Sequence, residues 1–90
     1  MTDPTAYSRM TTIELASWHD GLVSALDHAG RVVQCALDAL IDAHLDGHGE
    51  VVLQARQRGH EEATLEMRRI ERSLASVRNE MERRRLPVQG

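Results

Sequence analysis

The sequence predicts an all-α protein: an antiparallel two-helix hairpin that is expected to dimerise into a four-helix bundle. Apolar residues recur every three or four positions over two long stretches, which is the period of an amphipathic helix. Between the stretches lie Gly47 and Gly49, whereas the only two prolines, Pro4 and Pro87, stand near the ends of the chain. With 90 residues, the chain is long enough for one small domain.

The first segment, residues 1–10, is polar and contains Pro4, so it is expected to be a flexible N-terminal tail. The hairpin is expected over 11–86. Its first helix, about 12–46, has a strong start signal, because Thr11 and Glu14 have the spacing of a capping box. Met10 and Leu15 have the spacing of a hydrophobic staple.

The first helix is predicted to stop at Gly47, a residue suited to the left-handed conformation that ends helices. A turn at 47–49 leads to a second helix over about 50–85. Pro87 prevents helical geometry at the residue before it, and 87–90 is expected to be a C-terminal tail. Gly59 costs this helix about 1 kcal/mol relative to alanine, and a break there, giving three helices, is the alternative.

In an antiparallel hairpin, the residue numbers of two residues that face each other add up to a constant. The apolar positions of the two helices face each other if this constant is about 96. The predicted pairs are Leu22 with Leu74, Leu26 with Ile70, Ala29 with Met67, Val33 with Ala63, and Leu37 with Gly59. A large residue faces a small one in three of these five pairs, as interdigitating packing prefers, and Gly59 is expected to make room for Leu37. Trp18 is expected to pack on Val77 and Arg78 near the open end of the hairpin, and the alternative is that it is exposed as a partner anchor. His44 is placed in the core register.

The first helix carries a second apolar stripe beside the hairpin seam. Its members are Ala25, Ala29, Val32, Ala36, Ala39 and Ala43. An apolar arc this wide is typical of a helix that packs against more than one neighbour, so these residues and Trp18 are the predicted partner interface. The alternative is a hairpin with a generous core and some exposed alanines.

These features favour a non-enzymatic interaction module, such as an adaptor, a small chaperone or an assembly or secretion-associated subunit. It would act through the apolar and acidic face of the first helix. Residues 11–46 contain six acids and one arginine, a net charge of −5, whereas residues 50–85 contain nine arginines and seven acids, a net charge of +2. The expected partner is a second copy or another helical protein. No cofactor, small-molecule substrate or membrane is predicted, and the expected location is the cytoplasm.

The segment "DAHLDGHGE" (42–50) suggests the first alternative function, a metal-binding helical protein. His44 and His48 have the i,i+4 spacing of zinc ligands, and Asp42, Asp46 and Glu50 could supply an oxygen. However, Gly47 interrupts the helix between the two histidines, and turn chemistry alone accounts for the aspartate and the glycines. The sequence therefore favours a plain turn here, with no metal.

A second alternative is a small nucleic-acid-associated regulator that uses the arginine-rich end of the second helix, Arg83–Arg85. The net charge of −3 and the two aromatic residues, one Trp and one Tyr, argue against it. His19 and His28 are expected to be solvated. Cys35, the only cysteine, excludes an intramolecular disulfide and is expected to be an ordinary residue.

In size and layout the predicted hairpin resembles WxG-type secreted hairpins and the short helical chaperones of type III secretion needles. The signature residues of the WxG family do not carry over. That family has Trp-x-Gly in the turn, whereas "WHDG" is Trp-x-x-Gly and begins at Trp18, far from the predicted turn. The family's tyrosine-based export signal after the second helix is also missing, because Tyr7 is the only tyrosine. The likeness is one of architecture, and architecture does not assign function.

Overall fold

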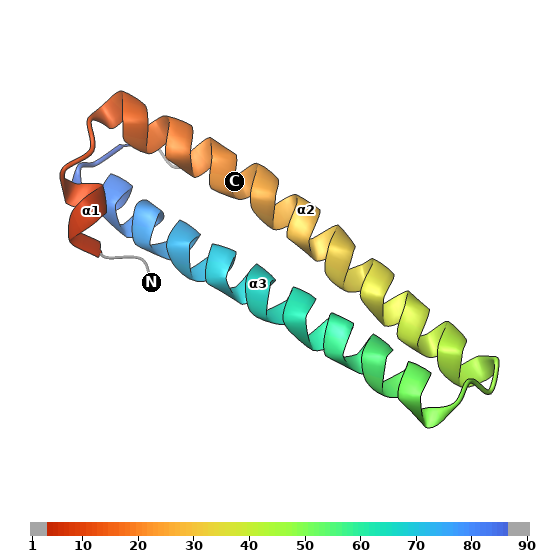
Figure 1. The fold of residues 1–90 in the computed structure, drawn as a ribbon. Coiled ribbons are helices and arrows are strands. Elements are labelled where there is room, and N and C mark those ends of the chain that lie inside the picture. Colours follow the sequence, from red (N-terminus) through yellow and green to blue (C-terminus); the bar gives the residue numbers. More distant parts are fainter. Residues whose placement is uncertain (1–3, 87–90) are drawn as a thin grey trace.

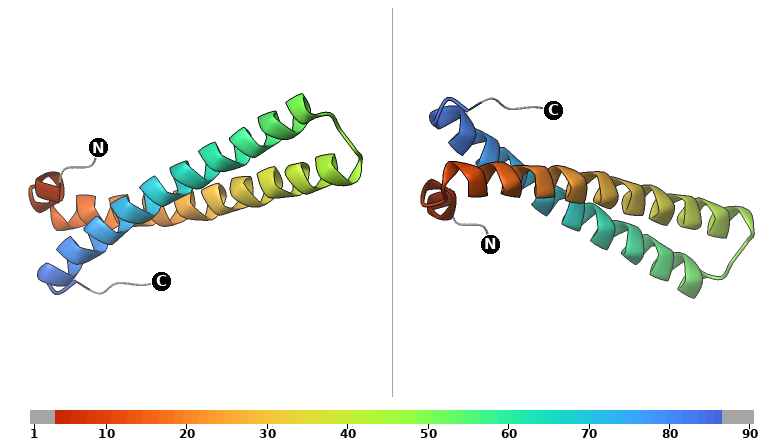
Figure 2. Two further views of the ribbon diagram at one scale, coloured as in Figure 1. Left: turned by 90° about the horizontal axis from the view of Figure 1, so that it is seen from below. Right: turned by 90° about the horizontal axis from the view of Figure 1, so that it is seen from above.

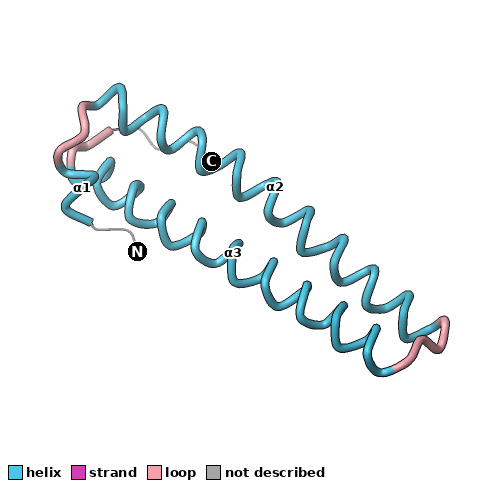
Figure 3. Tube along the Cα trace, in the orientation of Figure 1, coloured by secondary structure: helices cyan, strands magenta, loops and turns pink. Residues whose placement is uncertain are grey.

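The computed structural model describes residues 4–86, whose regular structure consists of three α-helices: α1 (Pro4–Ser8), α2 (Thr12–Leu45) and α3 (Glu50–Arg83). The two long helices lie side by side and antiparallel, joined by a tight connection (Figures 1 and 3). The short α1 lies against the end of α3 (Figure 1). The predicted all-α hairpin is thus confirmed. None of the helices in this part of the chain has the length and apolarity that a membrane crossing requires.

The N-terminal segment differs from the prediction of a flexible tail over 1–10. Residues 4–8 form α1, with Pro4 at the first helical position, where a missing N–H is harmless. Tyr7 is only 3% exposed and belongs to a cluster with Leu15, Val77 and Met81. Burial of this aromatic ring stabilises an ordered conformation even though most neighbouring residues are polar. Residues 1–3 and the predicted tail 87–90 lie outside the described residues.

The start of α2 follows the sequence signals. The Thr11 hydroxyl accepts a hydrogen bond from the Glu14 backbone N–H, and the Glu14 carboxylate accepts one from the Thr11 N–H, both at 3.1 Å. The predicted capping box is therefore confirmed. Met10 is half-buried and packs against the cluster that contains Leu15, as the staple requires.

The end of α2 is a Schellman motif, the helix ending in which a left-handed residue reverses the chain. Gly47 has a φ of 69°, its N–H donates to the carbonyl of His44, and the N–H of His48 donates to the carbonyl of Ala43. The predicted stop at Gly47 is confirmed. The same pattern ends α3, where Arg85 has a φ of 57° and the Leu86 N–H donates to the carbonyl of Met81.

The second helix runs through Gly59 without a break, since α3 is continuous from Glu50 to Arg83. Gly59 is exposed, and a Cβ added there would meet no atom within 4 Å. The expectation that this glycine makes room for Leu37 is therefore wrong. The side chains of this half of the hairpin are less closely packed than the pairing pattern implied.

Gly59→Ala is accordingly expected to raise the free energy of unfolding by about 1 kcal/mol, because alanine restricts the unfolded chain and favours the helix. The measurement is the urea midpoint of the two proteins at equal concentration. Gly47→Ala is the matched control of opposite sign, because the positive φ at that position strains any side chain. A loss of stability in Gly59→Ala would show that something packs closely against this position.

The hairpin seam follows a strict seven-residue repeat. On α2 the residues with reduced exposure on the seam are Leu15, His19, Leu22, Leu26, Ala29, Val33, Ala36, Leu40 and Ala43, and on α3 they are Leu53, His60, Ala63, Met67, Ile70, Leu74, Val77 and Met81. At the two ends of α2 the prediction differs, since Trp18 is 47% exposed and His44 is exposed, whereas His19 and Ala43 are buried. A constant step of seven keeps one seam facing its neighbour, and positions 18 and 44 fall outside that seam.

The core is concentrated at the end of the hairpin opposite the turn. Leu15 and Val77 are fully buried there, with Leu74 and Met81 beside them at 2% and 5% exposure. In Figure 2 the two long helices cross at an angle and spread apart toward the turn. Near the turn, Leu45 and Val51 are about 80% exposed (79% and 81%). The stability of the fold therefore rests mainly on the end away from the turn.

Candidate functional site

The main candidate for function is an apolar stripe on the side of α2, outside the hairpin seam. It consists of Trp18, Ala25, Val32 and Ala39, which are seven residues apart and so share one side of the helix. Trp18 and Val32 are 47% and 43% exposed, and the two alanines are half-buried. We call these four residues the α2 stripe.

The other three predicted interface residues lie on the hairpin seam. Ala29 and Ala43 are 7% and 4% exposed, so the rest of the chain already covers them in this conformation. Ala36 shares their heptad position and is half-buried. The seven predicted residues therefore divide into the four residues of the α2 stripe, of which Trp18 and Val32 are exposed, and a seam set of three, because a 4-3 spacing samples two neighbouring heptad positions in turn.

The outer surface of α3 contrasts with that of α2. Exposed large apolar residues on α2 are Ile13, Trp18, Val23, Val32, Ile41 and Leu45, whereas on α3 they are Val51, Val52 and Leu65. Two of the three on α3 stand in its first turn, and its remaining outer positions are mostly arginine, glutamate and glutamine. The apolar surface without a partner thus belongs chiefly to α2.

The acidic residues of α2 do not follow the stripe. Asp20 and Asp27 each come two residues after a member of the stripe, which places them about 200° around the helix from it. Between the ends of the stripe, the positions that border it on its outer side are Gly21, His28 and Cys35. The predicted "apolar and acidic face" is therefore two different faces, with the charge mostly away from the apolar stripe.

The histidine pair at the turn is not joined by a third potential metal ligand among the described residues. His44 is exposed, and His48 lies 3.9 Å from the Asp46 carboxylate, measured from Nε2 to Oδ2. Among residues 4–86 no group of three or more His, Cys, Asp or Glu side chains is arranged to hold a metal ion. The Schellman geometry of Gly47 accounts for this segment as a turn.

A shallow depression of about 250 Å³ lies beside the turn. It is lined by Ala39, Asp42, Ala43, Asp46, His48, Val52 and Arg56. Its volume is below the range of typical small-molecule sites, which are also predominantly apolar. The size and the polar lining of this depression therefore do not favour a small-molecule site, and the α2 stripe stays the main candidate.

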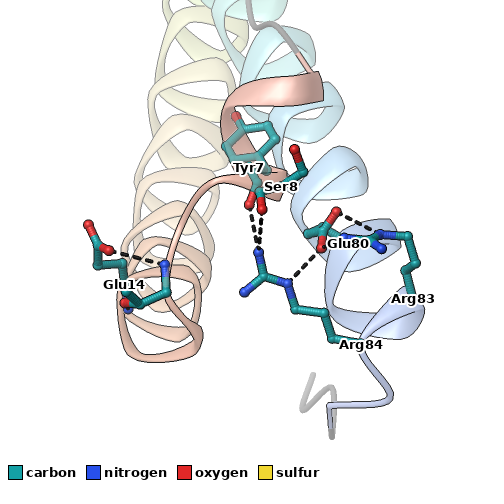
Figure 4. Close-up of polar contacts among 7 residues, drawn as sticks. Tyr7, Ser8, Glu14, Glu80, Arg83 and Arg84 are labelled. Carbon is teal, nitrogen blue, oxygen red and sulfur yellow. Dashed lines mark hydrogen bonds and ion pairs between the residues drawn. The ribbon is translucent and has the colours of Figure 1, made fainter.

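The arginines at the end of α3 serve the hairpin itself (Figure 4). Glu80, 8% exposed, accepts hydrogen bonds from Arg83 Nε at 3.0 Å and from Arg84 Nε at 2.6 Å. Arg84 Nη2 also donates to the carbonyl oxygens of Tyr7 and Ser8, at 3.0 and 3.2 Å. Arg84 thereby caps α1 at the negative end of its dipole, and two of the three arginines considered for nucleic acid already have partners within the chain.

This network makes stability depend on pH. Hydrogen bonds from Arg83 and then Arg84 hold the pKa of the Glu80 carboxyl below its ordinary value, since they favour the charged form. A lowered folded-state pKa gives stability that is complete above the unfolded pKa, about 4.3, and is lost as the pH falls through the folded value. We expect the melting temperature to fall as the pH drops below about 4.3.

The test compares Glu80→Gln with Glu82→Gln, an exposed glutamate on the same helix. Glu80→Gln should melt lower at pH 7 and lose less stability between neutral pH and acid, because the titrating group is gone. Glu14 contributes in the same direction, since its hydrogen bonds with Thr11 lower its pKa, so some acid dependence should remain. Identical acid profiles for the wild type and Glu80→Gln would contradict this assignment.

His19 differs from the expectation of a solvated histidine. It is 4% exposed, and its Nδ1 lies 3.2 Å from the Asp20 carboxylate. Its Nε2 is buried and has no hydrogen-bond partner within the described part of the chain. Position 19 lies seven residues before Leu26, just as Leu15 lies seven residues before Leu22, and this repeat was the sequence signal that places His19 on the seam. Cys35 and His28 are exposed.

No protein-family model, curated protein or solved structure matches the chain.

Proposed function

We propose that the protein is a non-enzymatic helical interaction module that binds a helical partner through the α2 stripe. The adaptor, small chaperone and assembly or secretion-associated subunit predicted from the sequence are all forms of this function. The observation that carries the proposal is the exposure of Trp18 and Val32 on one side of α2, 47% and 43%. The proposal keeps the cytoplasmic location expected from the sequence.

Two physical arguments support this reading. Tryptophan is favoured among the residues that dominate binding energy, and it does most when a partner covers it. A helix packed in parallel or antiparallel fashion against α2 would contact positions seven residues apart, which is the spacing of the stripe. Such a partner would turn the hairpin into part of a helical bundle.

The test is photo-crosslinking in the cells that produce the protein. A photoreactive amino acid placed at Val32 should give a protein adduct of defined mass. The same group at Arg69, an exposed position on α3 with a 72% exposed side chain, is the matched control and should give none. Adducts from position 69 with none from position 32 would overturn the proposal, whatever the identity of the adduct.

A further inference from the structure

Large and small residues alternate along the α2 stripe. When a second α2 stripe runs in the opposite direction, each large residue can face a small one. From one end it reads Trp18, Ala25, Val32, Ala39. If a second α2 lies antiparallel, with the two-fold axis between residues 28 and 29, Trp18 faces Ala39 of the second copy and Val32 faces Ala25. Every large side chain then meets a small one, which is the arrangement that interdigitating helices prefer.

We propose that a second copy of this chain covers the α2 stripe in an antiparallel, two-fold symmetric dimer, which is a four-helix bundle. This inference rests on the proposed function and names its partner. A two-fold interface must be complementary to itself, because the same patch occurs on both sides. A parallel pairing in register would place Trp18 against Trp18 and Ala25 against Ala25, which loses the match of sizes.

The charges along the stripe permit this pairing. The bordering residues at its centre, Gly21, His28 and Cys35, include no aspartate or glutamate, so acid does not face acid there. Glu14 and Asp42 would face each other at the two rims, where both are exposed and repulsion is small and screened by salt. A basic partner helix would find no row of acids along the stripe, since Asp20 and Asp27 lie on another side of α2.

The exposed area is larger than a monomer of this mass normally has. The chain exposes 6672 Å², whereas a globular monomer of 10.1 kDa exposes about 5,300 Å². Its radius of gyration is 17.3 Å, compared with about 12 Å for a compact domain of this length. The excess of about 1,400 Å² is distributed over the whole elongated hairpin, and a standard interface, which buries roughly 800 Å² on each partner, would remove part of it.

The first test is sedimentation equilibrium of the full chain over a wide concentration range, with helicity followed by circular dichroism. The wild type should sediment as a dimer. Val32→Glu should weaken association by about 100-fold or more, because each copy would bury a carboxylate against an apolar surface. Val23→Glu is the matched control: position 23 is nine residues away, on the opposite side of the helix, and similarly exposed at 38%.

The second test determines the orientation without disturbing the stripe. In an antiparallel pair about this axis, the two copies of residue 28 lie next to the dyad, whereas the two copies of Cys35 are about 20 Å apart along the helices. A short bismaleimide reagent should therefore link His28→Cys in a Cys35→Ser background into dimers, and should leave the wild type unlinked. Arg69→Cys in the same background controls for random collisions.

The outcomes are distinct. A monomeric wild type overturns the dimer, and Val32 crosslinks to another protein would then leave the proposed function standing. A dimer broken by Val23→Glu but not by Val32→Glu overturns the choice of surface. Efficient linking through the native Cys35 overturns this arrangement, because those two thiols come together only in a parallel pair in register or in an antiparallel pair whose axis lies near residue 35.

Discussion

Replacing Tyr7 with alanine is expected to lower the free energy of unfolding by about 3 kcal/mol, the usual cost of removing a buried aromatic side chain. The ring is 3% exposed and packs with Leu15, Val77 and Met81. Its loss would also release α1, whose carbonyl groups are held by Arg84. In a domain of this size the melting temperature should fall by more than about 10 °C.

The matched control is Ile13→Ala, an apolar residue of the same region that is 83% exposed and should change stability by less than about 0.5 kcal/mol. Both variants are compared with the wild type by urea denaturation at one protein concentration, because the proposed association would make stability depend on concentration. If Tyr7→Ala and Ile13→Ala unfolded at the same urea concentration, α1 would not be docked on α3.

The helix ends could be predicted because they are decided by local chemistry. Thr11 and Glu14 complete each other's hydrogen bonds within one turn of helix, and Gly47 adopts a positive φ that other residues avoid. Neither feature depends on the rest of the chain. The two long helices could also be predicted, because the period of their apolar residues is a property of each segment by itself.

The placement of Tyr7 could not be predicted in this way. Its burial depends on the meeting of residues 7 and 77, which are far apart in the sequence, and on Arg84 reaching the end of α1. The choice between Trp18 and His19 on the seam is a similar case. Hydrophobicity favours the tryptophan, but the geometry of two helices packed in register favours position 19, which is 4% exposed.

The candidate interface stays a prediction. The sequence indicated that α2 has more apolar surface than one neighbour can cover, and in the structure Trp18 and Val32 are 47% and 43% exposed. It did not separate the seam from the stripe, because alanines alternate between two neighbouring heptad positions and have the same hydropathy on both. Only the direction of α3 relative to α2 shows that Ala29 and Ala43 are covered.

The second large effect is expected from Leu15→Ala, which should lower the free energy of unfolding by about 3 to 4 kcal/mol. Leu15 is fully buried, and its neighbours in the cluster come from α1 and α3, so the cavity cannot close without moving both helices. Leu45→Ala makes the same change in the same helix at a residue that is 79% exposed, and should cost less than about 0.5 kcal/mol. Urea midpoints at equal concentration measure the difference.

The contrast between these two leucines reflects a gradient of stability along the hairpin. Backbone amides open locally with a free energy that follows nearby apolar burial, so exchange with deuterium should be slowest around Leu74 and Val77 and fastest around Val51 and Val52. Equal costs for Leu15→Ala and Leu45→Ala, or equally slow exchange at both ends, would contradict the gradient. Such a result would mean that another chain covers the turn end, where residues 4–86 leave Leu45 and Val51 largely exposed.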